Sequence, residues 1–233
     1  MPQDLAIAHA GQELAGRLFR PAGAPRAGVV MAHGLYSSMQ SEKLTRLAQA
    51  LARAGHLCLM FDALGCGVSP GDARHTTLTS RRDQILDAAQ ALAVAAPGLP
   101  LAYMGSSLGG TAALLAGRVR PPLCLLCWST PVDLTALMHR LAAQPAPPDL
   151  PLMVQDIPRH DLQAVLAASP RLLVVHGQED EVVPVRQAHL AYRLAPEPKD
   201  LLLLPGADHR LSRQEDQNQA TARSLAWLGR FAG

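Results

Sequence analysis

A pair of serines lies between glycines in the segment Met104–Gly110, which reads MGSSLGG and directly follows an apolar run. The string Gly105–Gly109 fits G-x-S-x-G with Ser107 at its centre, where a strand is expected to turn into a helix. So sharp a turn crowds the backbone and needs small residues two positions either side of a nucleophilic serine. Ser107 is therefore the candidate nucleophile, and we expect the Ser106 side chain to point away from the line of attack. The alternatives are a glycine-rich turn that only packs closely and a cradle for phosphate, and the motif alone does not decide.

A serine hydroxyl becomes a good nucleophile at neutral pH only when a base removes its proton and an acid orients that base. Asp180 lies a few residues beyond one apolar run, and His209 lies beyond the last one. Loops at the carboxyl ends of parallel strands meet at one edge of the sheet, so the sequence predicts a triad of Ser107, Asp180 and His209. Glu179 and Glu181 are competitors for the role of the acid, although exposure to solvent is the simpler expectation for both.

The chain contains nine histidines, so a histidine near a strand end is not informative by itself. His33 and His176 each follow a predicted strand directly and precede glycine, and we expect their rings to brace the loops rather than transfer protons. No sequence context supports a role for the others, which are His9, His56, His75, His139, His160 and His189.

A tetrahedral intermediate needs hydrogen-bond donors for its oxyanion, usually two backbone N–H groups. Leu108, which follows the candidate nucleophile, is expected to supply one of them. The other is expected from the loop that follows the strand at 29–32, where His33–Tyr36 leaves the backbone accessible. We favour the N–H of Leu35 for this role, with Tyr36 as the alternative.

Apolar runs alternate with helical patterns over most of the chain, which predicts an α/β fold with a mostly parallel sheet covered on both faces. The expected strands are residues 29–32, 57–61, 99–104, 123–128, 172–175 and 201–204. The expected helices are residues 77–96, 111–119, 186–194 and 214–231, with one more that presents Leu44, Leu47, Ala48 and Leu51 and stops at Gly55. Residues 5–10 and 13–19 flank Gly11 and predict an antiparallel hairpin at a sheet edge.

Residues 131–170 interrupt the alternation, and we expect a single domain over 1–233 that carries this segment as a short lid. Two helical patterns occur in it, at 133–142 and 160–168, among the prolines at 131, 145, 147, 148, 151, 158 and 170. A surface excursion without contact to substrate is the alternative. An acyl pocket is suggested by Leu134, Leu137, Met138, Leu150, Leu152, Met153 and Val154, although half of them fit a plain core role equally well.

Composition restricts the partners of the chain. A net charge of +2, 3% aromatic residues and the absence of like-charge runs give no footprint for nucleic acid, so we expect a small-molecule or acyl substrate. The first residues lack the basic start and unbroken apolar run of a signal peptide, which favours the cytoplasm. The uncharged stretch 88–117 is broken by prolines and glycines, so we expect no stable membrane insertion. Nothing in the sequence indicates an oligomeric state.

No cofactor or metal is needed to explain any motif. Cys124 and Cys127 have the spacing of a redox or metal pair, but in a strand their sulfurs would face opposite sides of the sheet. Together with Cys58 and Cys66 they are expected to be buried core residues. The glycines at 65 and 67 are followed by a loop rather than a helix, which argues against a dinucleotide site, and no G-K-[ST] string is present.

The strings MAHGLYSS, FDALGCGVSPG, MGSSLGG, HGQEDEVVP and GADHR occur in this order, and with them the chain resembles the α/β-hydrolase superfamily over about 27–130 and 171–233. The chain order Ser107, Asp180, His209 is the order of that superfamily. GSSLGG, together with DHR before a polar helix, is similar to short-lid acyl esterases, among them palmitoyl-protein thioesterases and acyl-glucuronide esterases. Small feruloyl esterases have a similar layout, including the FD and glycine turn at Phe61–Gly67.

The sequence therefore predicts a serine hydrolase that cleaves carboxylic esters or thioesters through an acyl-enzyme. A serine aminopeptidase or amidase shares the triad, but it would need an acidic group to anchor a substrate amine, and none is identifiable in the lid. A hydrolase-fold binding protein with negligible turnover is the third hypothesis, and an intact triad argues against it.

Overall fold

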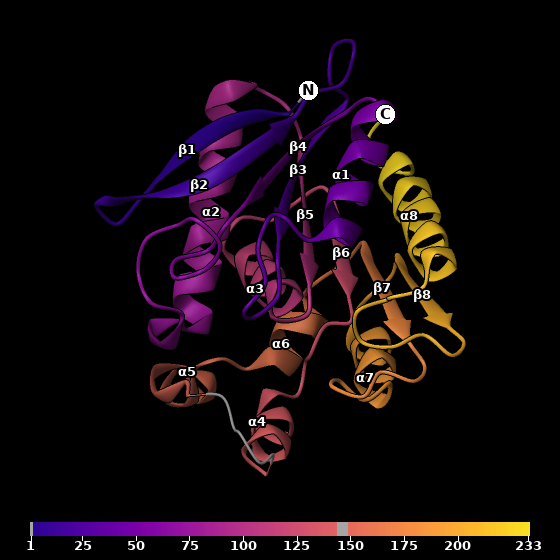
Figure 1. The fold of residues 1–233 in the computed structure, drawn as a ribbon. Coiled ribbons are helices and arrows are strands. Elements are labelled where there is room, and N and C mark those ends of the chain that lie inside the picture. The colour runs from indigo at the N-terminus through magenta and orange to yellow at the C-terminus, as the bar shows by residue number, and fades with distance from the viewer. Residues whose placement is uncertain (1, 144–148) are drawn as a thin grey trace.

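A computed structural model describes residues 2–143 and 149–233 of the chain and shows a central sheet between two layers of helices (Figure 1). The sheet has eight strands in the order β1-β2-β4-β3-β5-β6-β7-β8. The pairs β1–β2 and β2–β4 are antiparallel and the other pairs are parallel, so β2 runs against the direction of the rest of the sheet. The strands are β1 (Gln3–His9), β2 (Gln12–Phe19), β3 (Ala27–Ala32), β4 (His56–Phe61), β5 (Leu101–Ser106), β6 (Leu125–Trp128), β7 (Leu172–Gly177) and β8 (Lys199–Leu204). The mostly parallel sheet and the antiparallel N-terminal hairpin that the sequence predicts are confirmed.

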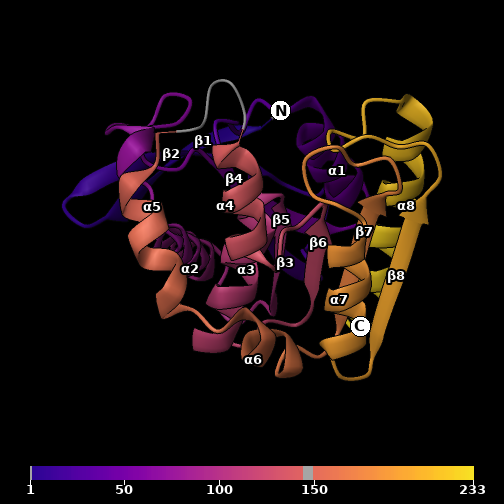
Figure 2. The ribbon, with the colours of Figure 1, turned by 90° about the horizontal axis from the view of Figure 1, so that it is seen from below.

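Helices cover both faces of the sheet, as the sequence predicts (Figure 2). One face carries α1 (Glu42–Arg53) and α8 (Gln214–Gly229), which pack against each other. The other face carries α2 (Leu78–Ala95), α3 (Leu108–Val119) and α7 (Arg186–Leu194). Each layer buries its own apolar cluster against the sheet, so the core has two halves separated by the strands.

The two cysteines with redox spacing lie in different halves of this core. Cys124 packs with the α1 and α8 side, whereas Cys127 packs with the α2 and α3 side. Both are free and buried, as are Cys58 and Cys66. Burial raises the pKa of the Cys124 and Cys127 thiols to about 12, so both are inert core residues at neutral pH, as the sequence predicts.

Between β6 and β7 the chain forms an insertion that lies near the carboxyl ends of the strands (Figure 1). Its elements are α4 (Leu134–Ala142), α5 (Pro151–Asp156), the 3₁₀ turn η2 (Ile157–Arg159) and α6 (Leu162–Ala167). The sequence predicts α4 and α6 but not α5, which begins at Pro151 within the proline-rich part of the segment. The sequence also does not predict the 3₁₀ turn η1 (Ala73–His75). The prolines at 145, 147 and 148 lie outside the described residues.

Two groups of hydrogen bonds attach the insertion to the rest of the molecule. Arg140 of α4 donates from Nη2 to the carbonyl oxygen of Glu181 at 2.6 Å. The buried carboxylate of Asp156 accepts from the Thr79 backbone N–H at 2.9 Å and from the Thr79 hydroxyl at 2.8 Å. Burial alone would raise the pKa of Asp156, but the hydrogen bonds from Thr79 and His160 outweigh it and lower that pKa. The insertion is therefore held at both the β7 loop and the start of α2.

Helix α3 begins at Leu108, three residues earlier than the sequence predicts. Glycine is a poor helix former, which is why Gly109 and Gly110 favour a later start on propensity alone. Close packing overrides that preference, because a Cβ on Gly109 would collide with the carbonyl oxygen of Ala32 at the end of β3. The absence of a side chain at Gly109 therefore lets the first turn of α3 lie directly against β3.

Among residues 2–143 and 149–233, every helix is too short or too polar to cross a bilayer.

Replacing Gly109 by alanine is expected to lower the free energy of unfolding by about 1–3 kcal/mol, because the first turn of α3 must move away from β3. Urea unfolding followed by circular dichroism measures this loss. Gly229→Ala is the matched control, since Gly229 also lies in a helix and nothing lies within 4 Å of the added Cβ. Equal stabilities of the two variants would contradict the packing account.

Candidate active site

Ser107 is the single residue between the last residue of β5 and the first residue of α3. Its backbone has φ +54° and ψ −127°, a conformation that non-glycine residues rarely adopt. The Ser107 N–H donates to the carbonyl oxygen of Trp128 at 2.8 Å, which fixes the turn to the neighbouring strand β6. A strained turn of this kind presents the serine side chain at the carboxyl edge of the sheet.

Three side chains that are distant in sequence meet at this edge. The Oγ of Ser107 lies 3.1 Å from Nε2 of His209. On the other side of the ring, Nδ1 of His209 lies 2.8 Å from Oδ2 and 3.0 Å from Oδ1 of Asp180. An ionised carboxylate only accepts hydrogen bonds, so Nδ1 carries the proton and Nε2 faces the serine hydroxyl with a lone pair. The arrangement can therefore accept the proton of Ser107.

The carboxylate of Asp180 is buried but well supplied with donors. Its Oδ1 accepts from the backbone N–H groups of Val182 at 3.0 Å and Val183 at 2.6 Å, in addition to His209. Burial alone would raise the pKa of Asp180, but the hydrogen bonds from His176 and His209 and the attraction of His209 outweigh it. The pKa of this carboxyl is therefore held far below its ordinary value, and Asp180 is charged at neutral pH.

The other predicted candidates occupy different places. Glu179 and Glu181 are exposed, and Glu181 reaches the site only by accepting the backbone N–H of His209 at 3.1 Å. Ser106 is buried at the end of β5, and the serine next to Nε2 of His209 is Ser107. Of the acids in this loop, Asp180 is thus the one that contacts the histidine ring.

The loop after β3 passes directly beside Ser107. A Cβ on Gly34 would lie 3.1 Å from Cβ and 3.7 Å from Oγ of Ser107, so this backbone approaches Ser107 as closely as a side chain permits. Leu108 begins α3, and the first N–H groups of a helix have no partner within the helix. Leu35 and Tyr36 are the two candidates for an N–H donor in this loop. Leu35 follows Gly34 directly, and Tyr36 lies one residue further on, with φ +53° and a side chain that is more than half exposed. The backbone of the loop after β3 and the start of α3 therefore both lie next to Ser107.

Two buried side chains hold the loop after β3 in place. His33 donates from Nδ1 to the Gly34 carbonyl oxygen at 2.7 Å and accepts the Ala63 N–H on Nε2 at 3.0 Å, so it braces the loop as the sequence predicts. Asp62, at the end of β4, accepts the Met39 N–H at 2.6 Å. Burial, helped by the charge of Arg81, lowers the pKa of His33 to about 3.

Two further side chains near the triad were not assigned to it by sequence reasoning. His176 contacts the carboxylate of Asp180 from inside the core, and the only sequence signal for this contact is a spacing of four residues. Lys43 of α1 lies within the electrostatic influence of Asp180 and Asp208. Burial lowers its pKa to about 8, although both carboxylates act to raise it. No signal in the sequence connects Lys43 with the loops of β7 and β8.

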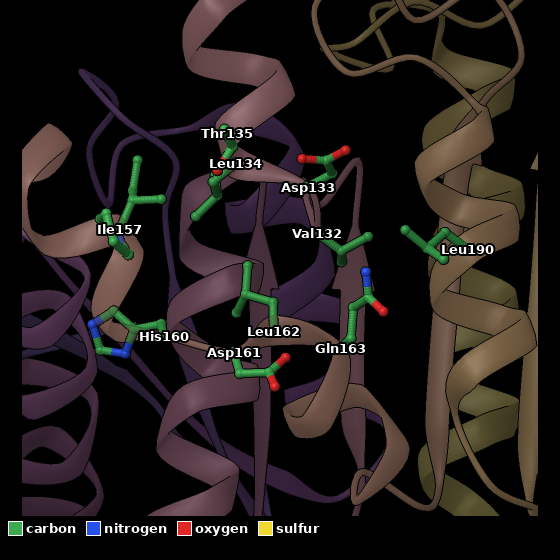
Figure 3. A pocket seen from close by; sticks show the side chains of 11 residues that line it. Val132, Asp133, Leu134, Thr135, Ile157, His160, Asp161, Leu162, Gln163 and Leu190 are labelled. Atoms are coloured by element: carbon green, nitrogen blue, oxygen red, sulfur yellow. The ribbon is translucent and has the colours of Figure 1, made fainter.

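A cavity of about 220 Å³ opens between the insertion and α7 (Figure 3). It is lined by Val132, Asp133, Leu134, Thr135, Ile157, Pro158, His160, Asp161, Leu162, Gln163 and Leu190. Ser107, Asp180 and His209 are not part of this lining, so the cavity is separate from the triad. In the described ranges, no three His, Cys, Asp or Glu side chains gather as a metal site.

The free energy of unfolding is expected to fall as the pH drops below 6.5, because the unfolded chain binds a proton at His33 that the folded chain rejects down to about pH 3. This residue contributes up to about 1.4 kcal/mol per pH unit. Urea unfolding of the wild type and His33→Asn between pH 6.5 and 4.5 measures the difference in slope, which is expected to be shallower in the variant.

The matched control for that experiment is His189→Asn, which changes an exposed histidine and should keep the wild-type slope. Burial also lowers the pKa of His56, which contributes in the same direction in all three proteins. Identical slopes in the wild type and His33→Asn would contradict the assignment of His33 as a buried neutral ring.

Comparisons with known proteins agree with this fold. The family described as serine aminopeptidase, S33, matches residues 23–145, which is more than half of the chain. The mitochondrial palmitoyl-protein thioesterase ABHD10 of Pongo abelii is 25% identical over 214 residues, covering 81% of this chain and 69% of the relative.

Solved structures of esterases are also similar. The esterase domain of a Rhodothermus marinus protein has a TM-score of 0.81 at 24% identity and covers 100% of both chains. Est1E of Butyrivibrio proteoclasticus, solved with ferulic acid bound, has a TM-score of 0.82 at 19% identity, covering 97% of this chain and 99% of that one. The resemblance to the α/β-hydrolase superfamily is thereby confirmed. The chain has the α/β-hydrolase fold and belongs to the serine aminopeptidase, S33, family of hydrolases.

Proposed function

We propose that this chain is a serine hydrolase that cleaves carboxylic esters or thioesters through an acyl-enzyme on Ser107, and that it needs no cofactor. The observation that carries the proposal is the continuous contact from Ser107 Oγ through His209 to Asp180, with distances of 3.1 Å and 2.8 Å. A hydroxyl, a base and an orienting acid within hydrogen-bond distance are what nucleophilic catalysis by serine requires.

Each member of the triad has one task in the proposed reaction. Ser107 Oγ attacks the carbonyl carbon while its proton moves to Nε2 of His209. The tetrahedral intermediate collapses with cleavage of the C–O or C–S bond, and His209 returns the proton to the leaving alcohol or thiol. A water then loses a proton to His209 and attacks the acyl-enzyme, which releases the acid and restores Ser107. Asp180 stays ionised throughout and stabilises the positive charge on His209.

The oxyanion of each tetrahedral intermediate would be held by the backbone N–H groups of Leu35 and Leu108. Support for Leu108 comes from its place at the start of α3, where the helix dipole favours negative charge. Support for Leu35 comes from the close approach of Gly34 to Ser107, with Tyr36 as its alternative. Removal of one such donor typically slows acyl transfer by about 100-fold or more.

The substrate class rests on two observations. Relatives named as thioesterases and esterases share the fold, and they support ester or thioester cleavage in this chain. An aminopeptidase would need an acidic group near Ser107 to anchor the substrate amine. Asp133 and Asp161 do line a cavity, but no residue of the triad does, so esters and thioesters are favoured over amides.

The segment 131–170 is proposed to be a lid on a single domain, with a small acyl substrate held beneath it. The bond from Arg140 to the loop that carries Asp180 supports a position close to the triad. The residues named for an acyl pocket divide as follows: Leu134, Leu137, Leu150 and Met153 are buried in the core, Met138 is partly buried, and Leu152 and Val154 are exposed. Leu152, Val154 and Met138 are thus the ones available to meet a substrate.

Fluorophosphonate labelling tests the nucleophile. The wild type is expected to be labelled at Ser107, and Ser107→Ala should lose the label together with at least about 1,000-fold of kcat/KM. Ser106→Ala is the matched control and should keep the label, since the side chain near His209 belongs to Ser107. Folded wild type that takes no label would remove the hydrolase proposal, and a label that depends on Ser106 would overturn the assignment of the serine.

The substrate class is tested with esters, thioesters and amides that carry the same series of acyl groups, and with aminoacyl amides. We expect turnover of p-nitrophenyl esters and acyl thioesters of increasing chain length, and slower turnover of the corresponding amides and of aminoacyl amides, because the acids that line the cavity, Asp133 and Asp161, lie in a lining that the triad does not share. Steady-state kcat/KM for each compound is the measurement. A preference for aminoacyl amides would replace the esterase proposal by an aminopeptidase.

A further inference from the structure

His176 lies at the end of β7 beneath the triad, and its side chain is completely buried. Its Nε2 lies 2.8 Å from the carbonyl oxygen of Val183 and 3.2 Å from Oδ2 of Asp180. Its Nδ1 has no hydrogen-bond partner in the part of the chain that the structure describes. The ring therefore makes all of its polar contacts through one nitrogen, and both contacts belong to the loop of the catalytic acid.

The partners of Nε2 decide where the proton of this ring resides. A carbonyl oxygen can only accept a hydrogen bond, so Nε2 must carry the hydrogen that points to Val183. The same N–H faces Oδ2 of Asp180 and is shared between the two acceptors. Nδ1 then carries only a lone pair. Burying a lone pair without a partner costs less free energy than burying an unpartnered N–H of a charged ring.

The contacts around the Asp180 carboxylate show what this N–H adds. Oδ1 receives the backbone N–H groups of Val182 and Val183. Oδ2 receives the Nδ1–H of His209 at 2.8 Å and the Nε2–H of His176 at 3.2 Å. Without His176, the only side chain that donates to Oδ2 would be the base that Asp180 has to orient.

We propose that His176 is a positioning residue for Asp180: its Nε2–H holds the carboxylate and the Val183 carbonyl together, and so fixes the acid that orients His209. The inference rests on the proposed hydrolase function. His176 acts through Asp180 and does not touch substrate, which distinguishes this role from bracing a loop. A bracing role would need the contact with Val183 alone.

The position of His176 predicts the direction of its effect on the pH profile. A donor on Oδ2 spreads the negative charge of Asp180 and weakens its pull on a proton at His209. Its removal leaves a more basic carboxylate, so the acidic limb of kcat/KM moves to higher pH. The charged groups near this loop are Lys43, which interacts with Asp180, Glu181, which accepts the His209 N–H, and Arg140, which donates to the Glu181 carbonyl oxygen. All of them stay unchanged in a variant at position 176.

The test compares His176→Phe, which keeps the ring volume but has no donor, with His176→Gln, whose amide N–H can take the place of Nε2–H. In His176→Phe we expect kcat per fluorophosphonate-reactive site to fall about tenfold or more, KM to change little, and the acidic limb to move upward. His176→Gln should recover most of both effects. Unchanged kcat and an unchanged limb in folded His176→Phe would overturn the proposal, because only packing would then have been lost.

Nitrogen NMR of histidine-labelled wild type supplies a test that does not depend on the folding of a variant. His176 is expected to carry a proton on Nε2 and to have no hydrogen bond at Nδ1. A proton on Nδ1 instead of Nε2 would overturn the proposal, because the ring could not donate to Asp180. Failure of the wild type to label at Ser107 would remove the proposed function, whereas the tautomer of His176 would still report whether the contact with Asp180 exists.

Discussion

The site depends on one geometric constraint, which is that β5 turns into α3 within the single residue Ser107. The turn requires positive φ at a non-glycine residue and leaves no room for side chains where the helix meets the strands. A Cβ on Gly105 would collide with the Gly109 carbonyl oxygen, and one on Gly109 with that of Ala32. The strain at Ser107 is borne by the close packing of α3 on β3 and β5, and the same packing brings the first N–H of α3 and the loop after β3 to the serine.

Hydrogen bonds to the buried carboxylate of Asp180 fix the rest of the site. A buried carboxylate such as Asp180 is costly unless its oxygens are supplied with donors. Here backbone N–H groups of its own loop and two histidine rings provide them, and the pKa of Asp180 is lowered in spite of burial. The charge that remains is directed at Nδ1 of His209, so the outer nitrogen of that ring faces Ser107 with its lone pair. His33, buried as a neutral ring with a pKa of about 3, fixes the neighbouring loop without adding a charge.

Much of this arrangement could be predicted from the sequence, because its signals are local. Strand and helix periods indicate the order of the elements, and because the ends of parallel strands share an edge, the sequence alone predicts that Ser107, Asp180 and His209 lie together. The start of α3 at Leu108 could not be predicted, since it depends on a close approach to Ala32 from another strand. The contact of His176 with Asp180 likewise depends on how the loop folds back onto β7, and α5 begins within a proline-rich stretch that interrupts the helical pattern.

Mass spectrometry of the enzyme stopped within one turnover of an acyl thioester tests acyl transfer to Ser107 most directly. A transient acyl group is expected on the peptide that contains Ser107, forming before the free acid accumulates and disappearing as the acid is released. Asp180→Asn should slow its formation, because His209 would lose the carboxylate that orients it. Release of acid by an active enzyme without any acyl adduct on Ser107, or with the adduct on another residue, would contradict the account.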